Sequence, residues 1–285
     1  MADIISALVP KDGASRRVAR GLSYGAGPRR KLDLYRPRHQ GDAPLPVIVF
    51  FYGGAWNSGS RTHYGFAARA LAAMGYLVVV PDYRLVPEIE YPAFLEDCAA
   101  AVGWVGDNAA SYGGDPERLV LAGHSAGAYN AACLALDPRW LAPAQRASVV
   151  GVIGLSGPYD FYPFDGPISR RVFGQADNPR QTQPIHHVGP DAAPKLLITG
   201  GRDNLVLPRN SVNLSAALER AGVASSLRLY PRLGHAGTLL CLSLPLRWMA
   251  PVLEDCRAFL ADVTNPGTGP GDPSAGEHRA AAARQ

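Results

Sequence analysis

The apolar residues of the chain follow two alternating spacings. Short unbroken apolar runs, such as residues 47–52 and 76–80, are typical of strands that are buried on both faces of a sheet. Between such runs, segments such as residues 92–110 carry apolar side chains at helical spacing. Strands that alternate with helices predict an α/β fold, with a mainly parallel central sheet and helices on both of its faces. We expect a single domain of this kind over residues 21–264.

Three segments depart from this alternation. Residues 1–20 are expected to form an N-terminal arm, with at most one short helix. Residues 157–190 form an irregular insert after the sixth expected strand, and they are rich in Pro, Gly, Asp and aromatic residues. A long insert of this kind commonly serves as a lid or as a binding loop. Residues 265–285 contain Gly, Pro, Ala and charged residues without an apolar core, which predicts a disordered tail.

Composition and charge narrow the function classes. Hydrophobic residues make up 47% of the 285 positions, which is enough for a packed core. The formal net charge is only +4 and the basic residues form no dense stripe, so we expect no nucleic-acid partner. No run approaches the ~20 apolar residues of a membrane span, and residues 4–10 are too short for the apolar part of a signal peptide. We therefore expect a cytoplasmic protein without membrane contact, either a monomer or a homodimer.

The segment Gly123-His-Ser-Ala-Gly127 carries the clearest chemical signal. It matches Gly-x-Ser-x-Gly between an expected strand and an expected helix, which is the context of a nucleophile elbow. The sharp turn requires small residues two positions before and after Ser125, and the two glycines meet this requirement. The alternative is that Ser125 only caps the following helix, because serine is a favoured N-cap residue. The strand and the helix on either side favour the role of nucleophile.

A serine nucleophile needs a base, and the base needs an acid that orients it. In chains with such an elbow, the acid and then the histidine follow the serine. His235 lies in a Gly-His-Ala-Gly loop after the last expected strand, so we predict that it is the base. Asp203 follows a buried strand and a Gly-Gly turn, and we predict that it orients the imidazole. Asp160 is the main rival for the acid, because it also follows an expected strand.

Attack on a carbonyl carbon creates an oxyanion, which preorganised N–H donors must stabilise. We expect one donor to be the amide of Ala126, directly after the nucleophile. Gly53 and Gly54 follow the apolar run 47–52 and are expected to supply the other donors, because adjacent glycines let backbone amides approach a ligand closely. The alternative is a simple Gly-Gly turn. The presence of a nucleophile elbow in the same chain argues against that alternative.

Aromatic residues lie near the expected nucleophile and in the insert. Our candidates for contact with the substrate are Trp56, Tyr129, Tyr159, Phe161 and Tyr162. An aromatic wall suggests an apolar acyl or aryl group, although the same side chains would equally serve to pack the insert onto the domain. The four cysteines are widely spaced, without a Cys-x-x-Cys pair. With no nucleotide-binding motif either, we expect no metal and no cofactor.

Five motifs occur together in one order: residues 52–56, residues 81–84, the elbow, Asp203 and His235. Together they resemble the carboxylesterase branch of the α/β-hydrolase superfamily, which includes the hormone-sensitive-lipase-like and the kynurenine-formamidase-like esterases. The resemblance covers roughly residues 30–262. It implies an α/β-hydrolase fold, a catalytic triad of Ser125, Asp203 and His235, and an oxyanion hole. It does not specify the substrate.

Two positions differ from the pattern that the resemblance implies. Tyr52 stands where the family usually has a histidine that helps to hold the oxyanion loop, and His124 stands where hormone-sensitive-lipase-like enzymes usually have an aspartate. A large N-terminal cap is also not expected, since only about 30 residues precede the first clear strand. His124 and the small N-terminal segment favour the smaller formamidase-like or general esterase group. The resemblance also implies that residues 82–84 are structural.

These observations lead to one main function and two alternatives. The main hypothesis is a serine hydrolase, a carboxylesterase that cleaves small carboxylic esters through an acyl-enzyme. The first alternative is an arylformamidase-like hydrolase of N-formyl amides, for which the same triad would serve. The second alternative is a ligand-binding module that has the hydrolase fold without catalysis, and the presence of all three triad residues argues against it.

Overall fold

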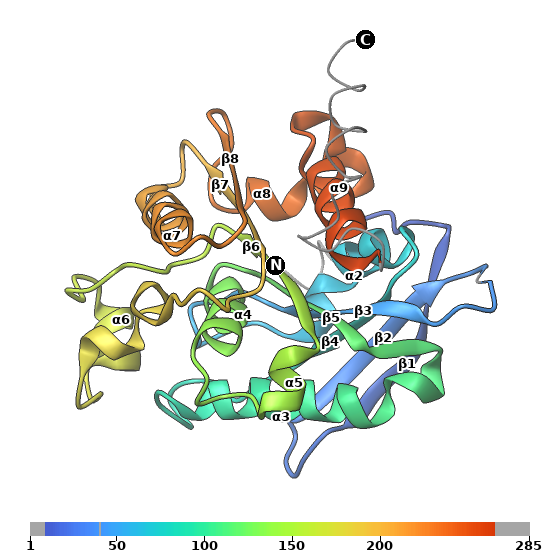
Figure 1. The fold of residues 1–285 in the computed structure, drawn as a ribbon, viewed down its shortest axis with the longest axis horizontal. Coiled ribbons are helices and arrows are strands. Elements are labelled where there is room, and N and C mark those ends of the chain that lie inside the picture. Colours follow the sequence, from blue (N-terminus) through green and yellow to red (C-terminus); the bar gives the residue numbers. More distant parts are fainter. Residues whose placement is uncertain (1–8, 40, 266–285) are drawn as a thin grey trace.

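The structure, a computed structural model, describes residues 9–39 and 41–265. Within these residues, eight strands form one sheet in the order β1-β2-β4-β3-β5-β6-β7-β8 (Figure 1). Strand β2 pairs antiparallel with β1 and β4, and the other neighbouring pairs are parallel. The expected α/β fold with a mainly parallel sheet is therefore confirmed. The strands are β1 (Ser15–Ser23), β2 (Lys31–Pro37), β3 (Leu45–Phe51), β4 (Leu77–Pro81), β5 (Gly114–His124), β6 (Val149–Leu155), β7 (Lys195–Gly200) and β8 (Ser225–Tyr230).

Helices cover both faces of the sheet. On one face, α3 and α4 pack against alternate residues of β3 such as Val47 and Val49. On the other face, α2, α8 and α9 pack against the intervening residues Ile48 and Phe50. The pleat of a strand separates these side chains, and Figure 1 shows α3 and α9 on opposite sides of the sheet. The α-helices are α2 (Gly65–Ala72), α3 (Ala93–Asn108), α4 (Ala126–Leu136), α5 (Pro143–Ala147), α6 (Pro167–Phe173), α7 (Arg209–Arg220), α8 (Gly237–Leu240) and α9 (Val252–Thr264).

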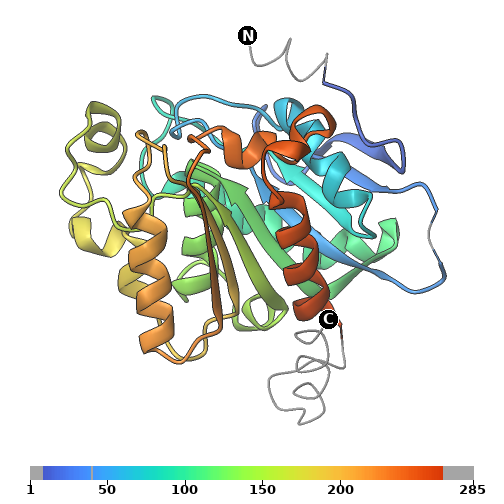
Figure 2. The same cartoon turned by 90° about the horizontal axis from the view of Figure 1, so that it is seen from above.

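Short 3-10 helices occur in the connections. They are η1 (Arg61–Tyr64), η2 (Ala109–Tyr112), η3 (Pro179–Thr182), η4 (Pro184–His187) and η5 (Leu244–Met249). The insert over residues 157–190 contains α6, η3 and η4, so it has more regular structure than its sequence indicated. It stands beside α7 at one end of the sheet, whereas β1 and β2 lie at the other end (Figure 2). Among the described residues, no helix combines the length and the apolarity that crossing a membrane requires.

The expected boundary of the N-terminal arm at residue 20 is wrong. Ser15–Ser23 is strand β1, which pairs with β2 at the edge of the sheet. Its sequence contains three arginines, and most of its side chains are exposed or half-buried. An edge strand buries little surface, so its sequence lacks the apolar pattern by which the inner strands are found. The expected disordered tail lies outside the described residues, except for Asn265.

Candidate active site

Ser125 lies in a sharp turn between β5 and α4. Its backbone has φ 54° and ψ −123°, a conformation that residues other than glycine rarely adopt. A Cβ atom on Gly123 would lie 2.3 Å from the carbonyl group of Gly127, and one on Gly127 would lie 2.0 Å from the carbonyl oxygen of Phe51. Only glycine therefore fits at either position. This close packing supports the turn, and it explains why the pentapeptide needs its two glycines.

The carboxyl ends of parallel strands bring three distant residues together. Ser125 follows β5, Asp203 follows β7 and His235 follows β8. The Nδ1 atom of His235 lies 2.8 Å from Oδ2 of Asp203, and its Nε2 atom lies 2.9 Å from Oγ of Ser125. Because an ionised carboxylate only accepts hydrogen bonds, Nδ1 carries the proton and Nε2 accepts from the serine hydroxyl. This tautomer is the one in which an imidazole can act as a base toward the serine.

Backbone amides hold Asp203 in its ionised form. Burial by itself would raise the pKa of this carboxyl. Hydrogen bonds from His235 and from the amides of Val206 (2.8 Å) and Leu205 (3.0 Å) lower the pKa below its ordinary value instead. The two amides bind Oδ1, which leaves Oδ2 for the imidazole. The carboxylate is therefore both charged and fixed in orientation.

The rival acid Asp160 does not contact this hydrogen-bonded chain. Its Oδ2 atom accepts a hydrogen bond from Nδ2 of Asn213 on α7, at 2.6 Å. Its backbone amide donates to Oδ1 of Asn210, which is also on α7. The carboxylate and the amide of Asp160 therefore both attach the start of the insert to α7. The choice of Asp203 over Asp160 agrees with these contacts.

His124 lies beside the triad but does not bind the serine hydroxyl. Its ring centroid is 4.9 Å from that of His235, and its Nε2 atom is 3.2 Å from the carbonyl oxygen of His235. Nε2 therefore carries the proton, and His124 donates to the backbone of the loop that holds the base. Burial, together with the neighbouring His235, lowers the pKa of His124 to about 3. The ring stays neutral and adds no charge next to the base.

The loop after β3 approaches the nucleophile. A Cβ on Gly53 would lie 2.8 Å from the carbonyl oxygen of His124, so only glycine permits this approach. The amide of Gly53 donates to the hydroxyl of Tyr64, at 3.0 Å, and is therefore engaged within the protein. No acceptor within residues 9–39 and 41–265 binds the amides of Gly54 and Ala126. Of the three expected oxyanion donors, Gly54 and Ala126 are available to a ligand in this structure.

Tyr52, the residue at the position of the usual histidine, is held by an arginine that the sequence did not single out. Its hydroxyl accepts a hydrogen bond from Nη2 of Arg29, at 2.7 Å, and the same atom donates to the carbonyl of Gly59, at 2.8 Å. Its ring stacks on Tyr83 with centroids 4.5 Å apart. Arg29 thereby joins the beginning and the end of the loop. No local motif around Arg29 indicates this role.

Residues 82–84 have the structural role that we expected. Asp82 accepts hydrogen bonds from the amide and from the guanidinium of Arg61. Arg84 binds Asp97 on α3 through Nε and Nη2, at 2.8 and 2.9 Å. The hydroxyl of Tyr83 donates to the carbonyl of Tyr52 at 2.7 Å. All three side chains anchor the loops around the end of β4.

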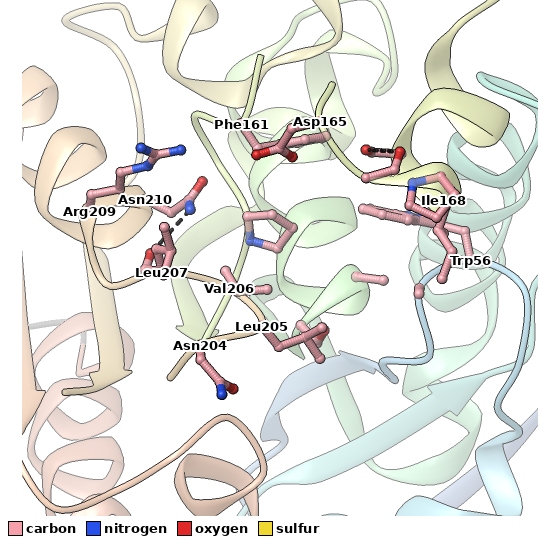
Figure 3. A pocket seen from close by; sticks show the side chains of 17 residues that line it. Trp56, Phe161, Asp165, Ile168, Asn204, Leu205, Val206, Leu207, Arg209 and Asn210 are labelled. Carbon is pink, nitrogen blue, oxygen red and sulfur yellow. Dashed lines mark hydrogen bonds between the residues drawn. The ribbon is translucent and has the colours of Figure 1, made fainter. Parts of the chain in front are cut away.

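Ser125 opens into a cavity of about 420 Å³ between the loop after β3, the insert and the start of α7. Figure 3 shows Trp56 and Ile168 on one side of the cavity and Arg209 and Leu207 on the other. Most of its lining is apolar. The lining includes Ser125, its neighbour Ala126, and Ala55 and Trp56 of the loop after β3. The other lining residues are Pro158, Phe161, Asp165, Gly166, Pro167, Ile168, Ser169, Asn204, Leu205, Val206, Leu207, Arg209 and Asn210.

The five aromatic candidates for substrate contact have different positions. Trp56 and Phe161 line the cavity. Tyr129 and Tyr159 are fully buried and do not line it, and the hydroxyl of Tyr129 donates to a backbone carbonyl of η3. Tyr162 is 40% exposed and also lies outside the lining. The buried Tyr129 of α4 and Tyr159 of the insert therefore serve for packing. The sequence analysis missed the aliphatic lining residues Leu205, Leu207 and Ile168, because nothing in their local sequence relates them to Ser125.

Comparison with protein families identifies the chain. The sequence model of the BD-FAE family matches residues 32–218, which include the elbow and the acid. The chain belongs to the BD-FAE family. This membership and the esterase relatives confirm the resemblance to the carboxylesterase branch of the α/β-hydrolases. His235 lies beyond the matched segment, so its candidacy as the base of this BD-FAE member rests on its place in the sequence and on its contacts with Asp203 and Ser125.

Relatives of this BD-FAE protein carry esterase names. It is 33% identical over 245 residues to esterase LipC of Mycobacterium tuberculosis, covering 78% of this chain and 60% of LipC. It is 30% identical over 260 residues to isoprenylcysteine alpha-carbonyl methylesterase ICME of Arabidopsis thaliana, covering 82% of this chain and 59% of that protein. The chain thus spans about 60% of the length of these curated relatives.

Solved structures show the same fold. A truncated carbohydrate esterase from gut microbiota superposes with a TM-score of 0.76 at 23% identity, covering 90% of this chain and 99% of the other. Esterase 2 of Thermogutta terrifontis with bound butyrate superposes with a TM-score of 0.71 at 22% identity, covering 91% and 97%. These likenesses confirm the α/β-hydrolase fold of the BD-FAE chain.

Proposed function

We propose that this protein is a serine carboxylesterase that acts through an acyl-enzyme. The observation that carries the proposal is the hydrogen-bonded chain from Asp203 through His235 to Ser125, which ends in a cavity. Its relatives are an esterase and a methylesterase, which supports an ester as the substrate. The hydroxyl of Ser125 would attack the carbonyl carbon while Nε2 of His235 takes its proton. That proton then goes to the leaving alcohol, and water hydrolyses the acyl-enzyme by the same route.

The amides of Gly54 and Ala126 are our proposed oxyanion donors. Both lack an acceptor within the described residues, whereas the amide of Gly53 donates to Tyr64. Ala126 lies at the first turn of α4, where the helix dipole also favours negative charge. Loss of one such donor costs ~3 kcal/mol of transition-state stabilisation. In this assignment Gly53 contributes its close approach to the elbow.

The cavity supports an apolar acyl or alcohol group. Leu205, Leu207 and Ile168 line it although they are 72%, 44% and 42% exposed. Exposed large apolar side chains gathered at a cavity mark a binding surface. A chain that extends past the cavity would cover them. We therefore expect hydrolysis of p-nitrophenyl butyrate and hexanoate to have a higher kcat/KM than hydrolysis of the acetate.

The decisive variant is Ser125→Ala. It keeps the Cβ of the elbow and removes the nucleophile, so kcat for p-nitrophenyl acetate should fall by about 10⁴-fold or more. Ser148→Ala is the matched control, because Ser148 is buried at the opposite end of the strands, where its carbonyl accepts from Leu119. A Ser125→Ala protein with most of its activity would contradict the mechanism.

Two further measurements separate the alternatives. A fluorophosphonate should label the wild type at Ser125, and a protein that takes no label would favour a binding module. N-formylkynurenine in the substrate series tests the formamidase alternative, which predicts a higher kcat/KM for it than for the esters. The cytoplasmic location and the oligomeric state of the protein stay predictions.

A further inference from the structure

The loop after β3 has a backbone that needs support from outside. Gly54, Ala55 and Trp56 follow one another with φ of 134°, 50° and 57°. Positive φ is unfavourable for alanine and tryptophan, and such residues persist only where their surroundings hold them. Ala55 and Trp56 also line the cavity next to Ser125. The strained segment is thus the part of the loop that faces the nucleophile.

A single buried side chain binds the end of this segment. The indole Nε1–H of Trp56 donates to Oδ1 of Asn130, at 3.1 Å. Asn130 is fully buried, and its Nδ2 atom donates to the Sγ of Cys98 on α3, at 3.5 Å. The backbone carbonyl of Trp56 accepts from the amide of Val86, at 2.9 Å. The position of Trp56 is therefore set at its side chain by Asn130 and at its backbone by Val86.

Asn130 belongs to the same helix as the nucleophile turn. Helix α4 begins at Ala126, directly after Ser125, and Asn130 lies four residues further, about one helical turn. The helix is buried along its whole length. It therefore presents the amide of Ala126 at its first turn and binds the Gly54–Trp56 segment at its second. This bond therefore joins the two proposed parts of the oxyanion hole through a side chain, in addition to the close backbone approach of Gly53 to His124.

We propose that Asn130 is a positioning residue that sets the distance between the two oxyanion donors. The inference rests on the proposed function, since it assumes that Gly54 and Ala126 bind an oxyanion. Without the bond, the strained segment keeps its backbone hydrogen bonds but loses the side-chain anchor of Trp56, and we expect the amide of Gly54 to shift relative to that of Ala126. Donors of this kind act in the transition state, so their displacement lowers kcat while KM changes little.

Packing of the indole is the competing explanation. The Trp56 ring also contacts Phe173 and Tyr129, with centroids 4.9 and 5.2 Å away, and these contacts alone would hold it in a purely structural account. In that account, loss of the Asn130 bond lowers the melting temperature and leaves kcat unchanged. The two accounts therefore differ in kcat, which can be measured.

A double-mutant cycle tests the bond directly. Asn130→Ala removes the acceptor and Trp56→Phe removes the donor while keeping an aromatic ring. Misplacement of catalytic groups by about 1 Å costs up to about 100-fold in rate, so we expect kcat to fall about 10- to 100-fold in Asn130→Ala, with KM within about twofold. The double variant should be no slower than the slower single variant, because both changes break the same bond.

A conservative variant and a control complete the experiment. Asn130→Asp keeps an acceptor oxygen for the indole and should recover kcat to within about threefold of the wild type. Asn108→Ala is the matched control, since the side chain of Asn108 donates to the backbone carbonyl of Trp104 in its own helix, and the change should leave kcat unchanged. If Asn130→Ala fails to fold, Trp56→Phe and Asn130→Asp still test the bond.

The outcomes distinguish the positioning role of Asn130 from the proposed esterase activity. Wild-type kcat in Asn130→Ala and Trp56→Phe, or additive losses in the double variant, would overturn the positioning role and leave the esterase proposal standing. A wild type that neither cleaves esters nor takes the fluorophosphonate label would overturn the proposed function, and the positioning role with it.

Discussion

The triad and the loop after β3 meet at the same serine but are held in different ways. Ser125, Asp203 and His235 bind one another directly, and each follows the carboxyl end of a strand. The aromatic side chains of the loop are instead anchored by residues from other parts of the chain. Tyr52 is held by Arg29 and Trp56 by Asn130, which lie 23 and 74 residues away along the chain.

This difference separates two kinds of functional residue. A triad residue does chemistry, so its type and its place after a strand are restricted by the reaction itself. A supporting residue only has to reach the loop with a hydrogen bond, and many positions in a fold can do that. The first kind forms motifs, whereas the second kind is specific to the packing of one chain. We therefore expect substitutions in the triad to lower activity strongly. Substitutions that break the hydrogen bonds of the supporting residues should lower kcat less and leave KM nearly unchanged.

The largest effect among the partners of the serine is expected at Asp203. In Asp203→Asn, the amide oxygen would keep the amides of Leu205 and Val206, and its NH₂ group would face Nδ1 of His235. The imidazole would then hold its proton on Nε2 and could not accept from the serine. We expect kcat/KM for p-nitrophenyl butyrate to fall by about 10³- to 10⁴-fold.

Asp160→Asn is the control for this change, because Asp160 bonds Asn213 on α7 and not His235. Its kcat/KM should stay within about threefold of the wild type, the range expected of a residue outside the triad. If both variants lost activity equally, the assignment of the acid would be wrong.

A smaller effect is expected at Tyr52. Tyr52→Phe removes the hydroxyl that Arg29 binds, but Arg29 keeps its bonds to the carbonyls of Gly59 and Tyr83. One of three anchors is lost, so we expect kcat to fall about 3- to 10-fold with KM nearly unchanged, less than the loss of a whole oxyanion donor. Steady-state kinetics with p-nitrophenyl butyrate measure both constants.

Tyr76→Phe provides the matched control for the loop. Tyr76 is also a buried tyrosine, but its hydroxyl bonds Thr264 at the end of α9, at 3.3 Å. Its kcat should equal that of the wild type. A loss at Tyr52 as large as that at Asp203 would break the distinction between the two halves of the site.

The smallest effect on activity is expected at Lys195, at the beginning of β7. Its amino group is fully buried and donates to the carbonyl of Ala193 at 2.8 Å. Burial, with a smaller contribution from Arg146, lowers its pKa from 10.5 to about 7. The unfolded chain therefore binds a proton that the folded chain does not bind between about pH 7 and 10.5. The free energy of unfolding should rise with pH across this window.

Lys195→Met should remove this pH dependence and raise the free energy of unfolding at pH 7 by about 1–4 kcal/mol. Urea unfolding between pH 7 and 10 measures the slope, and ester hydrolysis at pH 7.5 should be unchanged. A slope that persists in Lys195→Met would assign it to another group. Unchanged activity would show that the charge of Lys195, at the start of β7, does not influence catalysis at the carboxyl ends of the strands.

The sequence alone determined the sheet architecture, and it predicted the candidate nucleophile and the order of the candidate acid and base. Each of these depends on a local requirement: an elbow excludes any side chain at Gly123 and Gly127, and an inner strand must be apolar on both faces. The edge strand β1 was not predicted, because an edge strand need not be apolar on both faces.

The tertiary structure alone decided which backbone amides are free to donate near Ser125 and which side chains line the cavity. The Gly-Gly pair predicted oxyanion donors on the loop. Only the fold shows that the amide of Gly53 donates to the hydroxyl of Tyr64, whereas the amide of Gly54 has no acceptor among the described residues. Likewise, only packing distinguishes Trp56, at the cavity, from the buried Tyr129. A local pattern encodes the conformation of a short segment, whereas hydrogen-bond partners and cavity walls depend on which distant segments the fold brings together.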